Sequence, residues 1–169
     1  MDFLNTILIV GSGGREHALL KAMLRTDRPL CIYAYPGNPG MEHDGCILVD
    51  KKIGSWEGLA DWAEENEIDL TVVGPEQPLV EGIVDVFTRR GLVIFGPTAS
   101  AARIEGSKVF AKNLMKKYGV PTAAFETFSD KASALAYLKE RGAPIVVKAE
   151  GLAAGKGAMV CDTMEDARA

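Results

Sequence analysis

The stretch that decides the fold is ILIVGSGGREHALL, residues 7–20. The apolar run ILIV leads directly into the glycine turn GSGG, and the charged residues REH then open an apolar pattern with helical spacing. This order predicts a buried strand, a tight turn and the start of a helix. Three uses of the turn remain open at this point: it binds a dinucleotide, it binds another phosphate, or it serves packing alone.

The composition is that of an ordinary globular protein, with 169 residues of which 47% are hydrophobic, 25% charged and 7% aromatic. The chain is long enough to bury a core in one large domain or two small ones. A net charge of −4 favours neither nucleic acid nor an anionic membrane. Cys31, Cys46 and Cys161 form no CxxC pair, so we expect reduced thiols in a cytoplasmic protein and no zinc site.

Predicted strands and helices alternate in the first part of the chain. Each predicted strand is almost wholly apolar, which is typical of a parallel sheet covered by helices on both faces. The expected strands are Ile7–Val10, Leu30–Tyr33, Cys46–Val49, Leu70–Val73 and Leu92–Phe95. The expected helices are Glu16–Leu24, a helix capped by Ser55, and Leu79–Arg90.

The regular alternation of predicted strands and helices stops after residue 97. We expect helices at Thr98–Ile104, Ser107–Tyr118 and Ala132–Arg141, and strands at Ala124–Phe128, Pro144–Ala149 and Ala158–Cys161. The boundary falls near residues 97–106, which gives domains 1–104 and 105–169. A capped helix start at Thr163 has no stop signal, so we expect the chain to be a fragment of a longer protein.

The first glycine turn lacks parts of the dinucleotide fingerprint. Gly11 and Gly13 fit G-x-G-x-x-G, but Glu16 stands at the third glycine and the second strand ends without the acid that binds ribose. Free amides at a helix N-terminus still suit an anion, and Arg15 would add a forked donor. The alternative is a turn needed only for packing.

Two further loops follow parallel strands and should reach the same edge of the sheet. They are residues 37–40 (GNPG) and residues 74–76 (GPE). Ligands of open α/β sheets bind at this edge. We therefore expect Glu76 to accept a hydrogen bond from a substrate amine or hydroxyl, and the alternative is a helix-capping acid.

A second glycine loop, EGLAAGKG, occupies residues 150–157. It is no P-loop, because only three residues separate Gly151 from Gly155 and glycine follows Lys156. Its position between two strands predicts a flap that closes over phosphates, with Lys148 at its base. Lys108 begins a helix, where the dipole disfavours positive charge, so a nearby anionic ligand would relieve a conflict. The alternative is a solvated lysine.

Seven motifs together carry a resemblance to a known family. They are GSGGREHAL, PGNPG, DLTVVGPEQPLVEGIVD, IFGPT, EGSKVFAK, YGVPTA and APIVVKAEGLAAGKG, in this order. The chain resembles phosphoribosylamine–glycine ligases (glycinamide ribonucleotide synthetases) of the ATP-grasp superfamily, from residue 7 to about residue 167. The likeness is to the N-terminal part of these enzymes only.

The resemblance implies an α/β protein: a Rossmann-like N-terminal domain without a dinucleotide, then an incomplete ATP-grasp domain with its lid and glycine-rich flap. It implies ATP-dependent ligation of glycine to 5-phosphoribosylamine through glycyl phosphate, in purine biosynthesis. The implied ligands are the small molecules ATP, glycine and 5-phosphoribosylamine, with Mg²⁺ or Mn²⁺ in the full-length enzyme. We expect no nucleic acid or membrane partner, and a monomer or weak dimer.

The resemblance also assigns site residues by position. The substrate set is Gly13, Gly14, Arg15, Glu16, Asn38, Pro75 and Glu76. The ATP set is Lys108, Lys148, Glu150, Gly151, Leu152, Ala153, Ala154, Gly155, Lys156 and Gly157. The metal ligands are expected beyond residue 169, so the isolated chain is predicted to be inactive as a ligase.

Two alternatives to the ligase remain. One is another enzyme of the same superfamily, such as a carboxylase or a different purine-pathway ligase, against which the REH and GPEQPLVEGIVD stretches argue. The other is a non-enzymatic Rossmann-like fragment that binds a sugar phosphate without turnover.

Overall fold

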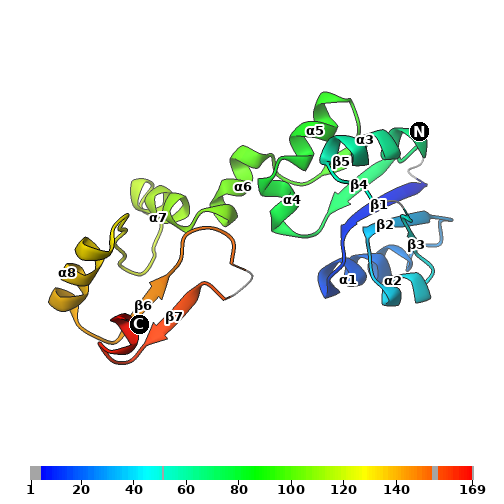
Figure 1. The fold of residues 1–169 in the computed structure, drawn as a ribbon. Coiled ribbons are helices and arrows are strands. Elements are labelled where there is room, and N and C mark those ends of the chain that lie inside the picture. Colours follow the sequence, from blue (N-terminus) through cyan, green and yellow to red (C-terminus); the bar gives the residue numbers. More distant parts are fainter. Residues whose placement is uncertain (1–4, 51, 154–155, 169) are drawn as a thin grey trace. The chain divides into compact units, whose positions relative to one another are not determined.

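The computed structural model describes residues 5–50, 52–153 and 156–168. The chain forms two compact units, Met1–Ala102 and Arg103–Ala169 (Figure 1). The first contains β1 (Thr6–Gly11), α1 (Gly14–Met23), β2 (Cys31–Pro36), α2 (Pro39–His43), β3 (Ile47–Leu48), α3 (Trp56–Glu65), β4 (Leu70–Val73), α4 (Glu76–Val80), α5 (Ile83–Arg89) and β5 (Ile94–Phe95). After α6 (Ala99–Gly106), the second contains α7 (Lys108–Lys117), α8 (Lys131–Arg141), β6 (Ile145–Lys148), β7 (Ala158–Cys161) and the 3₁₀ turn η1 (Asp166–Arg168).

The first unit is built on a five-stranded parallel sheet with the strand order β3-β2-β1-β4-β5. The central strand β1 pairs with β2 on one side and with β4 on the other. The chain adds strands to one side of β1 and then to the other, so the order reverses between β1 and β4. Open α/β sheets bind ligands outside the carboxyl ends of their strands at such a reversal. The predicted parallel sheet is confirmed.

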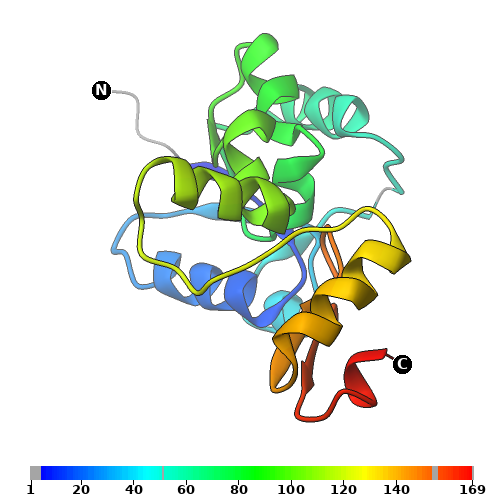
Figure 2. The same cartoon turned by 90° about the vertical axis from the view of Figure 1, so that its left-hand side faces the viewer.

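Helices cover both faces of this sheet (Figure 2). Successive side chains of a strand point to opposite faces, and alternate residues of β1 accordingly enter two hydrophobic clusters. Leu8 and Val10 pack with buried side chains of α3 and α5. Ile7 and Ile9 pack with α1 and α2. The core of the first unit therefore lies in two layers, one on each side of the strand that leads into the glycine turn.

The helices of the first unit differ from the prediction in two places. The single helix predicted for Leu79–Arg90 is wrong, because α4 and α5 are separate helices. Gly82 lies between them with φ at +91°, a left-handed conformation that ends a helix. The helix α2 was not predicted. Asn38 begins it by accepting the Met41 N–H at 3.0 Å, and Pro39 follows as its first residue.

The second unit has a small antiparallel sheet of β6 and β7. One face is covered, and its buried cluster consists of Leu138, Cys161 and Ala167. Val146 and Val160 pair across the sheet and point away from that cluster, and Val160 is 74% exposed. The second unit therefore covers its sheet on one face only.

The strand predicted at Ala124–Phe128 is wrong, since all five of these described residues lie outside strands. Their aromatic side chains pack against helices instead. The Phe125 ring lies 5.4 Å from the Lys112 ammonium group, and the Phe128 ring lies 5.2 Å from the Tyr137 ring. The apolar residues that suggested a strand thus attach a connecting segment to α7 and α8.

The helix start predicted at Thr163 is a single 3₁₀ turn in the described residues. Thr163 and Asp166 cap it reciprocally. The Thr163 N–H donates to the Asp166 carboxylate at 3.1 Å, and the Asp166 N–H donates to the Thr163 hydroxyl at 3.2 Å. The capping expected from the sequence is present, on a shorter element than predicted.

Candidate functional site

Three loops meet at the carboxyl edge of the first sheet, after β1, β2 and β4. The Gly37 N–H donates to the Gly11 carbonyl at 3.1 Å, and the Asn38 side-chain amide donates to the Ser12 carbonyl at 2.9 Å. These bonds join the first loop to the second. The third loop is joined to the first by Arg15, which donates to the Glu76 carboxylate at 3.0 Å. The structure therefore brings together the three loops that carry the predicted substrate residues.

Glu16 is the buried member of this group. Only 3% of it is exposed, and its Oε2 atom accepts the Gly13 N–H at 2.6 Å. A Cβ atom on Gly74 would lie 2.1 Å from Glu16 Oε1, and one on Gly11 would lie 2.6 Å from Glu16 Cγ. Glycine is therefore required at both positions, because the Glu16 side chain fills the space where side chains would lie. Pro75 contacts the same point, with its Cδ atom 2.8 Å from that Gly11 position.

Arg15 and Glu76 form an exposed ion pair between the first and third loops. The Glu76 carboxyl has a lowered pKa, first because its own backbone N–H at the start of α4 donates to it and second because Arg15 does. The two side chains are 70% and 36% exposed. Both predicted roles of Glu76 therefore fit its position, since it lies at a helix start and also at the ligand-binding edge of the sheet.

A second pair near this edge was missed by the sequence reasoning. His17 Nε2 lies 2.7 Å from Asp44 Oδ2, and Lys21 Nζ lies 3.4 Å from the same oxygen. The His17 hydrogen bond is the main cause of the lowered pKa of Asp44. These contacts attach α1 to the end of α2 and thereby support the Asn38 loop. The only signal in the sequence is that His17 lies one helical turn beyond the glycine turn.

Asn38 and Gly14 were also predicted to line the substrate site. The Asn38 side chain uses its oxygen on Met41 and its amide on Ser12, so it ties loops together in this structure. Gly14 is the first residue of α1, and a Cβ atom there would meet nothing within 4 Å. Gly14 therefore leaves the start of α1 open on that side.

The glycine flap of the second unit is anchored on the first turn of α7. Ser107 Oγ donates to the Glu150 carboxylate, and the Val109 N–H donates to its other oxygen at 3.1 Å. Lys108 Nζ donates to the Gly151 carbonyl. The Ser107 hydroxyl is the main cause of the lowered pKa of Glu150. Lys108 is therefore not a solvated lysine in this structure, and the anionic ligand expected beside it stays a prediction.

Apart from Lys108, which begins α7, the predicted ATP residues that the structure describes lie on this flap and its strands. Lys148 ends β6, and the Ala149 N–H donates to the Gly157 carbonyl at 2.8 Å, which closes the base of the flap. The Lys156 N–H donates to the Ala153 carbonyl at 2.8 Å. Leu152 is 40% exposed. Ala154 and Gly155 lie outside the described residues.

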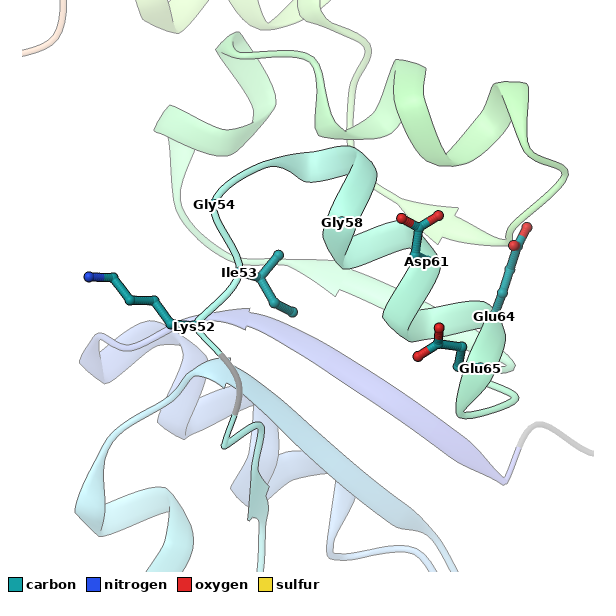
Figure 3. A pocket seen from close by; sticks show the side chains of 7 residues that line it. All are labelled: Lys52, Ile53, Gly54, Gly58, Asp61, Glu64 and Glu65. Carbon is teal, nitrogen blue, oxygen red and sulfur yellow. The ribbon is translucent and has the colours of Figure 1, made fainter.

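A surface hollow beside α3 contains none of the predicted site residues. Figure 3 shows its lining, which consists of Lys52, Ile53, Gly54, Gly58, Asp61, Glu64 and Glu65. Arg90 binds the carboxylates of Asp61 and Glu64 and donates to the Glu57 carbonyl at 3.2 Å. The acids Asp61 and Glu64 therefore fasten the end of α5 to α3, and we assign them no ligand.

The fold and its two glycine loops define a protein that begins an ATP-grasp module after a parallel-sheet domain. Residues 5–105 match the family described as "Phosphoribosylglycinamide synthetase, N domain", and residues 106–169 match its "ATP-grasp (A) domain". The chain belongs to the phosphoribosylglycinamide synthetase family. The resemblance carried by the sequence motifs and the expected fold class are both confirmed.

Curated relatives agree with this assignment. The chain is 53% identical over 161 residues to the phosphoribosylamine–glycine ligase of Listeria innocua, covering 95% of this chain and 38% of the relative. It is 52% identical over 161 residues to the ligase of Streptococcus suis, with the same shares. The chain thus spans about 38% of the length of these relatives.

Solved structures show the same fold. The phosphoribosylamine–glycine ligase of Thermotoga maritima superposes with a TM-score of 0.70 at 32% identity, over 96% of this chain and 37% of that one. The N5-carboxyaminoimidazole synthetase of Staphylococcus aureus, complexed with ADP, has a TM-score of 0.71 at 16% identity, over 99% and 44%. The second likeness bears on the fold alone.

Proposed function

We propose that this chain supplies the N domain and the beginning of the ATP-grasp domain of a ligase that joins glycine to 5-phosphoribosylamine. In the proposed reaction ATP transfers its γ-phosphoryl group to the glycine carboxylate, which gives glycyl phosphate and ADP. The amine of 5-phosphoribosylamine attacks the carbonyl carbon, loses a proton and displaces inorganic phosphate. The product is glycinamide ribonucleotide. The domain division proposed from the sequence, 1–104 and 105–169, assigns one part of this work to each domain.

The observation that carries the proposal is the separation of charge between the two glycine loops. Glu16 and Glu76 supply two carboxylates to the edge of the first sheet, with Arg15 bound to Glu76. Carboxylates accept hydrogen bonds from an amine or a ribose hydroxyl. The flap is flanked by Lys108 and Lys148, and ammonium groups suit a triphosphate. The first loop thus offers hydrogen-bond acceptors for the amine substrate, and the second offers cations for ATP.

The proposed roles follow this separation. The amine substrate would lie at the first edge, against Gly13, Gly14, Arg15, Glu16, Asn38, Pro75 and Glu76. ATP would lie under the flap, against Lys108, Lys148 and the residues 150–157. Amide groups of a glycine loop can approach phosphates closely because no side chains intervene. Lys108 would exchange the Gly151 carbonyl for a phosphate oxygen when the nucleotide binds.

Three further proposals concern the metal, the location and the assembly. Mg²⁺ or Mn²⁺ would neutralise negative charge on the ATP phosphates, and its ligands stay predicted beyond residue 169. In the described residues no group of three or more His, Cys, Asp or Glu side chains is placed to hold a metal ion. No helix of the described part is long and apolar enough to cross a membrane. We propose a cytoplasmic enzyme that is a monomer or weak dimer.

A hybrid ligase tests the proposed reaction. It joins residues 1–169 of this chain to the part of the Listeria innocua ligase that follows its matched segment. Ribose 5-phosphate and ammonia supply phosphoribosylamine in the assay. We expect ADP release that requires glycine, and glycinamide ribonucleotide detected by mass spectrometry. The intact Listeria innocua ligase is the positive control, and the 169-residue chain alone is expected to be inactive.

Two results would contradict the proposal. One is a folded hybrid that binds ATP but releases no ADP on addition of glycine and phosphoribosylamine. The other would come from the 169-residue chain itself, whose amide chemical shifts report where a ligand binds. Ribose 5-phosphate with ammonia should shift the amides around Gly13 and Glu76, and a response confined to other residues would remove the substrate from this edge. The second measurement stays decisive if the hybrid fails to fold.

A further inference from the structure

Glu16 occupies the third glycine position of the first turn, and the structure shows what this residue does there. Its carboxyl group lies within the concave side of the turn. The positions that Cβ atoms would take on Gly11, Gly13 and Gly74 all lie within 2.9 Å of a Glu16 side-chain atom. Only 3% of the surface of Glu16 is exposed. The space opened by three glycines is therefore filled by a side chain of the same chain.

In dinucleotide-binding turns this space and the amides beside it receive the pyrophosphate. Here the Gly13 N–H, at the start of α1, donates to Glu16 Oε2 at 2.6 Å. The donor that a phosphate would use is thus already bound by a carboxylate. A phosphate entering the turn would also meet the negative charge of that carboxylate. Glu16 therefore replaces the phosphate by an internal anion.

The other oxygen of the same carboxylate has a different situation. Glu16 Oε1 is buried, and no hydrogen-bond donor among the described residues reaches it. A buried carboxylate oxygen without a donor is costly, so buried polar atoms of this kind are normally paired. The atom lies 2.1 Å from the position that a Cβ atom would take on Gly74, where the loop after β4 begins. It therefore lacks the hydrogen bond that a buried carboxylate oxygen normally has.

We propose that Glu16 determines what the first glycine turn accepts: it excludes phosphate groups and dinucleotides and accepts a hydroxyl or amine donor at Oε1. The neighbouring Arg15 has its guanidinium group on the Glu76 carboxylate in the same group of loops. The exclusion of phosphate stands without the proposed ligase reaction. The identity of the donor as the amine or ribose hydroxyl of phosphoribosylamine rests on that reaction.

Variants of Glu16 test the exclusion directly in the 169-residue chain. Glu16→Gly restores the third glycine, Glu16→Gln removes the charge but keeps the volume, and Glu42→Gln is a control on an exposed acid of α2. Inorganic phosphate is the first probe, followed through the amide shifts of Gly13 and Gly14. We expect Glu16→Gly to bind phosphate at these amides about tenfold or more tightly than the parent chain and the control. Glu16→Gln should be intermediate.

Ribose 5-phosphate with ammonia is the second probe, for the donor. Glu16→Gln should weaken its effect on the same amides about tenfold, because the neutral amide is a poorer acceptor. Glu42→Gln should change nothing.

Two outcomes would overturn the inference. One is a parent chain that binds phosphate at Gly13 and Gly14 as tightly as Glu16→Gly. The other is a folded Glu16→Gly chain that still rejects phosphate. If Glu16→Gly does not fold, the Glu16→Gln chain decides. A phosphate affinity of Glu16→Gln equal to that of the parent chain would show that the charge of Glu16 does not exclude phosphate. An inactive hybrid ligase would count against the proposed reaction and leave the phosphate result untouched.

Discussion

The two glycine loops of this chain differ in what holds them. The turn after β1 lies over a sheet that is packed on both faces, and a buried carboxylate fixes it from inside. The flap after β6 follows a sheet packed on one face, and it is held by an exposed hydrogen bond from Ser107 and a part-buried one from Lys108. Glycine content alone therefore does not distinguish a preformed site from one that adapts to its ligand.

The largest difference between the loops should appear in hydrogen exchange. The amides of Ile7–Val10 and Leu70–Val73 are in the central parallel pairing, so they should exchange only on global unfolding. The amides of residues 150–153 and 156–157 should exchange about a thousandfold faster or more, because few buried contacts oppose local opening. Mass spectrometry or amide spectra of the 169-residue chain measure both. Equal protection of the two segments would contradict the comparison.

The next effect concerns which loop serves the nucleotide. Removing a charge-assisted contact to phosphate costs roughly 1.5–3 kcal/mol, so Lys148→Ala should weaken ATP binding by the hybrid ligase about tenfold or more. Arg15→Ala should leave ATP binding nearly unchanged, because Arg15 belongs to the other loop. Titration calorimetry compares the two variants with the parent. The reverse order would mean that the loops have been assigned to the wrong ligands.

A smaller effect is expected at Glu76. Glu76→Gln keeps an acceptor but loses the charge, so turnover with phosphoribosylamine should fall about fivefold, for a loss of about 1 kcal/mol. ATP binding should stay as it is. Glu81→Gln is the matched control, an acid that follows α4 and pairs with Gln77. Kinetics of the hybrid ligase with Glu76→Gln equal to those of the control would leave Glu76 as a helix-capping acid.

The smallest expected effect is a shift in one titration. The Ser107 hydroxyl donates to ionised Glu150 and is the main cause of its lowered pKa. The stabilisation from this bond is present above the ordinary pKa of a glutamate and is lost as the pH falls through the lowered value. Ser107→Ala should therefore raise the pKa of Glu150, seen as a higher midpoint in the pH dependence of the Val109 amide shift. Ser100→Ala, on the exposed side of α6, should leave the midpoint unchanged.

The sequence predicted best those features that depend on neighbours along the chain. The apolar strands, the glycine turn and the family motifs were sufficient for the parallel sheet and for the class of protein. The break at Gly82 and the helix begun by Asn38 depend on local backbone choices that a simple apolar pattern does not reveal. The strand predicted at Ala124–Phe128 failed because aromatic residues serve strands and helix-covering segments alike.

The candidate site was predicted as a set of residues and not as an arrangement. Glu16 was expected at the turn, but its burial depends on Gly74, which follows a different strand. His17 and Asp44 are 27 residues apart, and Ser107 and Glu150 are 43 apart. Contacts of this range require the fold to be known, since no periodicity connects their members. The sequence could therefore indicate which loops form the site, but not which carboxylate is bound within each loop.

The position of β1 has a consequence for synthesis on the ribosome. Of the strands in this sheet, β1 is made before the others, yet it lies in the centre and pairs with β4, which follows about 60 residues later. At roughly 5–20 residues per second, its apolar segment waits for about 3–12 s before both partners exist. Until β4 is made, one edge of Ile7–Val10 has no partner, and an unpaired hydrophobic strand edge favours aggregation. The central strand of the finished sheet is thus the one that waits longest for its second partner.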